Sequence, residues 1–208
     1  MDNDCFRYEV PSRQPMLIVI SGPSGVGKDS VLQAMKKRDL PLHFVVTATS
    51  RPPRTGEVNG VDYFFVSESA FEQMIADNEL LEHAVVYGQY KGIPKKQIRE
   101  AMATGKDVIL RIDVQGAATI RSLCPDTVMI FLIPASSEEL ITRLAERNTE
   151  TPEHLKIRLE TACKEMQRLP EFNYVVVNQQ DKLEETVDQI VSIIAVEHLR
   201  TVPRKVNL

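Results

Sequence analysis

A glycine-rich segment that ends in a lysine is the part of this sequence that most directly predicts chemistry. Residues 22–28 read GPSGVGK and match the pattern G-x-x-x-x-G-K. Glycines let the backbone wrap around an anion so that successive N–H groups point at phosphates, and the lysine places a positive charge at the β- and γ-phosphates. The alternative is a flexible turn with a solvated Lys28. The segment predicts a site for a nucleoside triphosphate and says nothing about the acceptor.

The position after this lysine departs from the usual pattern. A serine or threonine normally stands there, and its hydroxyl reaches Mg²⁺. In this sequence the residue is Asp29, and Ser30 follows it.

A second segment, residues 50–63, carries two arginines in a turn that is stiffened by two prolines. Arg51 and Arg54 in such a turn can bind a phosphate dianion through bidentate hydrogen bonds, and the hydroxyl of Tyr63 can complete the site. The alternative is that both arginines are surface charges and that Tyr63 is an aromatic residue of an edge strand.

The elements that position these residues follow from the hydrophobic pattern. Short apolar runs predict buried strands, and apolar residues at helical spacing lie between them. One helical stripe, which starts at Val31, follows the glycine-rich segment and places it between a strand and a helix, as a phosphate-binding loop requires. The alternation predicts one α/β domain with a parallel sheet and flanking helices. The predicted strands are residues 16–20, 44–46, 108–110, 128–133 and 174–177.

Two stretches do not fit this alternation. Residues 49–95 read as an insert with a basic turn, a strand at 63–66 and a helix that begins near Ser69. Residues 137–170 hold two charged helical segments, of which the first follows a capping box at 136–139, and they predict a mobile lid. The core of the domain is then residues 16–48, 96–136 and 171–208.

Composition narrows the class of protein. The chain has 208 residues with 43% hydrophobic and 26% charged side chains, typical of a globular domain, and a net charge of −4 that argues against nucleic-acid binding. Cys5, Cys124 and Cys163 are odd in number and scattered, which argues against a disulfide framework. The apolar runs are too short to span a membrane. The first 15 residues are acidic and resemble neither a signal peptide nor a transit peptide.

Four motifs that occur in one order resemble guanylate kinase. They are the phosphate-binding loop, the segment S-R-x-x-R-x-G-E-x-x-G-x-D-Y at 50–63, I-D-V-Q-G at 112–116 and R-L-A-E-R-N-T-E at 143–150. The similarity runs from about Leu17 to the C-terminal helix, and residues 25–29 and 90–94 look most like the plant organellar branch. The resemblance implies a P-loop fold and transfer of the γ-phosphoryl group of ATP to GMP or dGMP, which gives ADP and GDP. It also implies Mg²⁺, held mainly by the ATP phosphates and water. We expect a monomer or weak dimer that binds neither nucleic acid nor membrane.

The resemblance also assigns roles to individual residues. Glu82 and Asp113 are expected to accept hydrogen bonds from guanine, which offers two adjacent donors where adenine offers none. For Glu82 the alternative is a solvated charge. Lid arginines are expected to close on the transferring phosphates, although Arg143 can equally pair with a glutamate of its own helix. The predicted catalytic residues are Lys28, Arg54, Arg147 and Arg158. The predicted ATP-binding residues are Ser24, Gly25, Val26, Gly27, Lys28, Asp29, Ser30, Arg143 and Arg147. The predicted GMP-binding residues are Thr47, Arg51, Arg54, Tyr63, Glu82, Lys91 and Asp113.

Three positions depart from the family pattern. Family members usually have an acid where Arg111 stands, a hydroxyl residue where Ile93 stands, and tyrosine where Lys91 stands. Ile93 removes a hydrogen bond that would read guanine, whereas Lys91 keeps a donor for phosphate. We hypothesise that Asp29 and Arg111 form a salt bridge, and that Asp29 contributes to the Mg²⁺ site; the alternative is two independent changes.

Two other functions compete with this interpretation. A guanylate-kinase-like interaction module would bind acidic or phosphorylated peptides, but such modules typically lose the glycines and the lysine that this loop keeps. The second competing function is a kinase whose acceptor is AMP or a pyrimidine nucleotide. Glu82 and Asp113 argue against AMP, while Ile93 leaves the identity of the acceptor base undecided. The resemblance favours a plastid or mitochondrion after removal of a transit peptide, with the cytoplasm as the alternative.

Overall fold

The computed structural model describes residues 12–86, 88–145 and 152–208 and is built around a parallel five-stranded sheet. The strands lie in the order β2-β7-β1-β8-β9, and each neighbouring pair is parallel. All five residues of β1 are buried, as the continuous apolar run predicts for a central strand covered on both faces. The bounds are β1 Leu17–Ser21, β2 Leu42–Phe44, β7 Asp107–Arg111, β8 Val128–Ile133 and β9 Tyr174–Val177.

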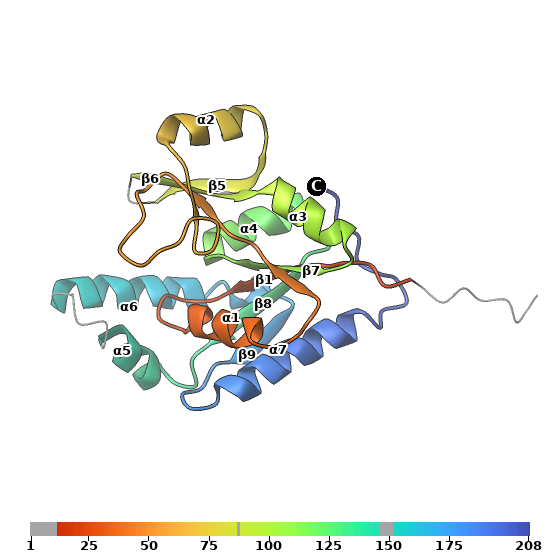
Figure 1. Ribbon diagram of the computed structural model, residues 1–208. Coiled ribbons are helices and arrows are strands. Elements are labelled where there is room, and N and C mark those ends of the chain that lie inside the picture. The colour runs from red at the N-terminus through yellow and green to blue at the C-terminus, as the bar shows by residue number, and fades with distance from the viewer. Residues whose placement is uncertain (1–11, 87, 146–151) are drawn as a thin grey trace, which may run out of the picture.

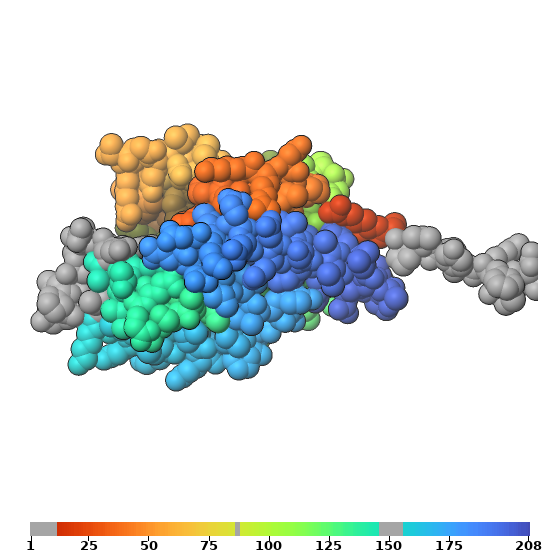
Figure 2. Space-filling model, turned by 90° about the horizontal axis from the view of Figure 1, so that it is seen from below, coloured from red at the N-terminus to blue at the C-terminus, as the bar shows by residue number. Residues whose placement is uncertain are grey.

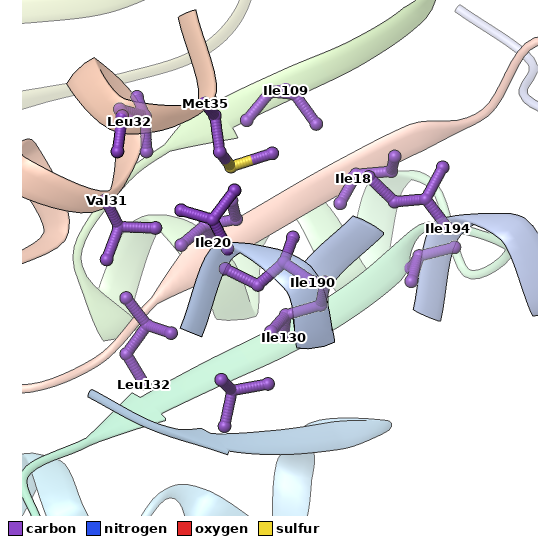
Figure 3. Close-up of a cluster of buried hydrophobic side chains, with 14 of the residues drawn as sticks. Ile18, Ile20, Val31, Leu32, Met35, Ile109, Ile130, Leu132, Ile190 and Ile194 are labelled. Atoms are coloured by element: carbon purple, nitrogen blue, oxygen red, sulfur yellow. The ribbon is translucent and has the colours of Figure 1, made fainter. Parts of the chain in front are cut away.

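Helices cover both faces of this sheet and confirm the predicted α/β fold (Figure 1). One face packs against α1 (Lys28–Lys36) and α7 (Leu183–Glu197), and the other packs against α3 (Lys95–Ala103) and α4 (Val114–Leu123). On the first face, isoleucines of the central strands point toward apolar side chains of α1 and α7, as Figure 3 shows. The phosphate-binding loop follows the buried strand β1 directly and leads into α1.

The insert forms a second, mixed sheet. Its strand order is β4-β3-β6-β5, in which β3 and β4 are parallel and the other pairs are antiparallel. The helix α2 covers it, and Phe71 of this helix stacks on Tyr90 with ring centroids 5.0 Å apart. The strand predicted at 63–66 is shorter, and the sequence did not indicate the other three strands. The bounds are β3 Ala48–Thr49, β4 Phe64–Phe65, α2 Glu68–Ala76, β5 Leu80–Val86 and β6 Gln89–Pro94.

Two helices, α5 (Ser137–Ala145) and α6 (Pro152–Met166), form the predicted lid region and pack through Leu140, Leu144 and Ala162. A short 3₁₀ helix, η2 (Leu169–Glu171), follows them. At the start of α5 the N–H of Glu139 donates to the hydroxyl of Ser136 at 3.2 Å, which is half of the predicted capping box. The other half differs, because the Glu139 carboxylate accepts from the N–H of Ala135. In Figure 2, which views the molecule from below, α7 (blue) lies across the face toward the viewer, with α5 (green) to its left.

The structure tests some of the other expectations from the sequence and leaves others open. Arg147 and Cys5 lie outside the described residues. Cys124 is buried and Cys163 is exposed, and both are free thiols. Within the described ranges, no helix is long and apolar enough to cross a bilayer. The exact boundaries of core, insert and lid stay a prediction.

Candidate functional site

The phosphate-binding loop joins β1 to α1 through backbone conformations that favour glycine. Gly22 has φ +146°, and a Cβ atom there would lie 2.4 Å from the carbonyl oxygen of Leu132. Gly27, the N-cap of α1, has φ +93°, and a Cβ atom there would lie 2.5 Å from Nδ2 of Asn178. Side chains at either position would force the loop to move. The glycines therefore keep the loop closed against its own core, with the N-terminus of α1 at its end.

Lys28 lies inside the loop. Its ammonium group donates to the carbonyl oxygens of Gly22 at 2.6 Å and Pro23 at 3.0 Å. Burial lowers the pKa of Lys28, and the charge of Arg111 lowers it further, while Glu165 and Asp29 act in the opposite direction. The lysine is thus held next to the loop amides, where a phosphate group would meet it.

Two residues fasten the loop from outside through the carbonyl oxygen of Val26. Asn178 donates to this oxygen through Nδ2 at 2.7 Å, and Arg143 donates to it through Nη1 at 3.0 Å. Arg143 also pairs with Glu139 one turn earlier in α5, so the helix-face alternative considered for it holds as well. A pocket of about 420 Å³ beside the loop is lined by residues that include Gly25, Gly27, Ser30, Arg143 and Asn178.

An acidic residue of α6 reaches the loop. The carboxylate of Glu165, near the end of α6, accepts a hydrogen bond from the backbone N–H of Ser24 at 3.0 Å. Asn178 and Glu165 were not predicted as site residues, because each lies more than 130 residues from the loop in sequence. No local motif marks either one.

A cleft of about 230 Å³ lies between the loop, the insert sheet and the end of β7. It brings together side chains from distant segments of the chain. Six predicted site residues line it: Lys28, Thr47, Tyr63, Glu82, Lys91 and Asp113. Ile93 and Arg111, two of the departures from the family pattern, line it as well. Ile93 is buried and packs in the apolar cluster beneath the cleft.

Two carboxylates share this cleft. Burial, together with the negative charge of Asp113, raises the pKa of Glu82 from 4.5 to about 7. Asp113 is the N-cap of α4, and its Oδ1 accepts from the N–H groups of Gln115 and Gly116 at 2.9 Å. Capping gives Asp113 a structural role, and its place in the cleft exposes it to a ligand too.

The predicted phosphate-binding arginines lie differently. Arg51 is buried and makes a bidentate ion pair with Glu57 at 2.5 and 2.6 Å, and its guanidinium lies 4.8 Å from the ring centroid of Tyr63. Arg54 is exposed, and its backbone N–H donates to Glu57 at 2.7 Å. The Arg51 guanidinium and the Arg54 N–H lower the pKa of Glu57 to about 2. Neither arginine lines the cleft, although Tyr63 connects the turn to it. Glu57 was not assigned a role from sequence.

For the remaining predicted residues, the structure confirms one contact and gives the exposure of two side chains. Arg111 and Asp29 form the hypothesised salt bridge. Arg158 is half-buried on α6, and Ser30 is exposed in the first turn of α1. The described residues contain no group of three or more His, Cys, Asp or Glu side chains that could hold a metal ion.

Comparison with known proteins agrees with this geometry. Residues 14–197 match the family model described as guanylate kinase. The chain is 52% identical over 199 residues to guanylate kinase 2, chloroplastic/mitochondrial, of Oryza sativa subsp. japonica, covering 95% of this chain and 70% of that protein. It is 45% identical over 186 residues to guanylate kinase of Bacillus subtilis, covering 89% and 90%. The crystal structure of guanylate kinase from Anaplasma phagocytophilum superposes with a TM-score of 0.71 at 30% identity, covering 91% and 89%. The chain therefore belongs to the guanylate kinase family.

Proposed function

We propose that this chain transfers the γ-phosphoryl group of ATP to GMP, giving ADP and GDP. The observation that carries the proposal is one cleft in which the lysine of a phosphate-binding loop and the carboxylates of Glu82 and Asp113 meet. Guanine presents N1–H and an exocyclic amine side by side, and two carboxylates are suited to accept from both.

GMP is bound on the insert side of this cleft. Glu82 and Asp113 accept from the base, with Thr47 near O6, while Lys91 and Tyr63 contact the phosphate. Arg51 and Arg54 complete the phosphate site from the turn that precedes Tyr63. The contact of the Arg51 guanidinium with the Tyr63 ring, 4.8 Å from its centroid, and the ion pair with Glu57 support this role, because they hold Arg51 beside a residue of the cleft.

ATP is bound by the loop amides of Ser24–Gly27, by Lys28, and by Ser30 and Arg143 beside the loop. The lid arginines Arg147 and Arg158 close on its phosphates. Mg²⁺ fits as an ion that arrives with ATP, because Mg²⁺ is commonly held by one or two carboxylates together with substrate phosphates. Asp29 supplies such a carboxylate, next to Lys28 and 68% exposed. When bound, the ion neutralises charge on the ATP phosphates.

The reaction moves one phosphoryl group between two anions. The bond from the γ-phosphorus to the β–γ bridging oxygen breaks, and ADP leaves with the electron pair. A new bond forms from an anionic oxygen of the GMP phosphate to the same phosphorus, so no proton has to be removed by the protein. Alignment and charge neutralisation are the contributions required of the chain. Closure of insert and lid excludes water and so suppresses hydrolysis of ATP.

Membership of the guanylate kinase family also suggests a second acceptor, an oligomeric state and a cellular location. We propose dGMP as a second acceptor, a monomeric or weakly dimeric state, and no binding of nucleic acid or membrane. Residence in a plastid or mitochondrion is supported by similarity to the rice relative. Imaging of the full-length protein fused to a fluorescent protein tests this location, and a cytoplasmic signal would contradict it.

The activity is tested by measuring ATP-dependent release of ADP with Mg²⁺ and GMP, dGMP, AMP or UMP as acceptor. We expect strong stimulation by GMP over AMP, and Lys28→Ala controls for a contaminating kinase. Binding of GMP without stimulated ADP release would refute the proposed function. Equal stimulation by AMP would show that Glu82 and Asp113 do not select the base.

A further inference from the structure

Arg111 occupies a position that its pairing with Asp29 does not fully explain. It is the last residue of β7 and stands opposite Ile20 of β1 in the central sheet, just before the phosphate-binding loop begins. Its side chain is 32% exposed and lines the same cleft as Lys28, Glu82 and Asp113. A cation carried by the central sheet thus lines the cleft that also contains Lys28, Glu82 and Asp113.

Asp29 holds this guanidinium in place. Asp29 follows Lys28 in the first turn of α1, and its carboxylate pairs with Nη1 of Arg111. A guanidinium carries five N–H donors in a planar fork, so one group can pair with a carboxylate and hold a phosphate oxygen at once. Because Asp29 is mostly exposed to water, the pair contributes little to stability. Fold stability alone is therefore a weak reason for an arginine in this cleft.

Arg111 and Lys28 line the same cleft. The charge of Arg111 acts on Lys28, the residue expected at the β- and γ-phosphates. Phosphoryl transfer spreads negative charge over the equatorial oxygens of the migrating group, and fixed cations beside that group lower the barrier.

We propose that Arg111 is a catalytic residue: its guanidinium, positioned by Asp29, binds the phosphoryl group during transfer from ATP to GMP. This inference rests on the proposed function. In this proposal Arg111, at the end of β7, neutralises phosphoryl charge in addition to Lys28 and the lid arginines.

The test compares Arg111→Ala and Arg111→Gln with the wild type. We expect kcat to fall about 10²- to 10³-fold, while the dissociation constants of GMP and of a non-hydrolysable ATP analogue change less than about threefold. Added methylguanidinium should restore part of the kcat of Arg111→Ala. Arg38→Ala is the matched control, because Arg38 pairs with Glu184 and Asp188 away from the cleft; its kcat should stay at the wild-type value and should not respond to methylguanidinium.

Two results would overturn the proposal while the proposed function stands. One is a kcat of Arg111→Ala and Arg111→Gln within about threefold of the wild type. The other is recovery of kcat in the double variant Asp29→Asn/Arg111→Ala, which would mean that Arg111 only neutralises Asp29. A wild-type protein without GMP-dependent ADP release would instead overturn the proposed function, and this inference with it. Thermal unfolding of each variant, with Arg111→Gln keeping a polar side chain without the positive charge, separates lost chemistry from lost folding.

Discussion

Replacing Glu82 by glutamine removes a charge that the folded protein holds at a cost. The side chain lies half-buried on β5 beside Asp113, and these surroundings raise its pKa from 4.5 to about 7. At about 1.4 kcal/mol for each unit of pKa, the raised value corresponds to at most ~3.5 kcal/mol in the free energy of unfolding. Because part of the side chain is in contact with water, screening reduces this to about 1–2 kcal/mol.

The sign of the pH dependence follows from the raised value. The folded state favours the protonated carboxyl, so the stability that Glu82 contributes is present below pH 4.5 and is lost as pH rises toward 7. Above pH 7 the free-energy cost of holding the ionised Glu82 in the folded protein is constant. Glu82→Gln does not titrate, so its free energy of unfolding should exceed that of the wild type by about 1–2 kcal/mol at pH 8. The difference should shrink steadily as the pH falls to 5.

Urea unfolding at several pH values between 5 and 8, at constant ionic strength, measures this difference. Glu160→Gln, which removes an exposed negative charge on α6, is the matched control. A difference between Glu82→Gln and the wild type that is the same at every pH would refute the reasoning, because it would reflect packing rather than ionisation. A wild type that is the more stable protein at pH 8 would refute it as well.

The same ionisation governs binding of GMP. The ionised Glu82 accepts from guanine N–H groups through a charged oxygen, whereas glutamine offers only a neutral amide oxygen, so Glu82→Gln should weaken GMP binding about 10- to 100-fold at pH 8. At pH 6 the wild type must release a proton from Glu82 when GMP binds, and the variant has none to release there. Calorimetry in two buffers of different ionisation enthalpy measures this difference in proton release. Equal proton release by both proteins would show that Glu82 does not contact the base in its ionised form.

Three further substitutions test other parts of the site. Lys28→Ala should lower kcat by about 10³-fold or more, which steady-state kinetics measures. The free energy of unfolding should change by less than ~1 kcal/mol in urea, because burial of this ammonium group is itself unfavourable. Glu165→Gln keeps an acceptor for the Ser24 N–H and removes a negative charge, so a non-hydrolysable ATP analogue should bind about 3- to 10-fold more tightly, less so at high salt; weaker binding would contradict this. Asn178→Ala removes a donor to the Val26 carbonyl and should lower the free energy of unfolding by about 1–3 kcal/mol in urea.

The core of the fold was predictable because its signals are local. Buried parallel strands read as continuous apolar runs, and the runs at 128–133 and 174–177 match β8 and β9 residue for residue. The run at 44–46 was placed two residues late. The side-chain amide of Gln97 hydrogen-bonds to both the N–H and the carbonyl of Val46, which ends the ladder of β2 early. A contact across 51 residues leaves no trace in the local pattern.

The insert sheet was largely missed for a different reason. β3 has two residues, too few for an alternation of apolar and polar side chains to be visible, and the longer β5 (LLEHAVV) and β6 (QYKGIP) show no strict alternation. The ion pair of Arg51 with Glu57 was also missed, because two arginines in a turn predict a phosphate site whether or not an acid already pairs with one of them. Residues that form one contiguous motif, such as the phosphate-binding loop, were identified, whereas Glu165 required the tertiary fold.

The charges in the cleft explain how it can orient GMP. Asp113 lines the cleft together with Glu82 and Lys28, and its negative charge favours the protonated form of both groups. Arg111 adds its charge to the side of Lys28. A GMP molecule that enters with its phosphate toward Glu82 would bring a dianion against a carboxylate in a partly desolvated space, where the repulsion is stronger than in water. The opposite orientation pairs the base donors with the carboxylates and turns the phosphate toward Lys28. In the proposed function, the polarity of the cleft, set by residues on β5, β7 and the loop, is therefore expected to align the acceptor with the donor phosphates.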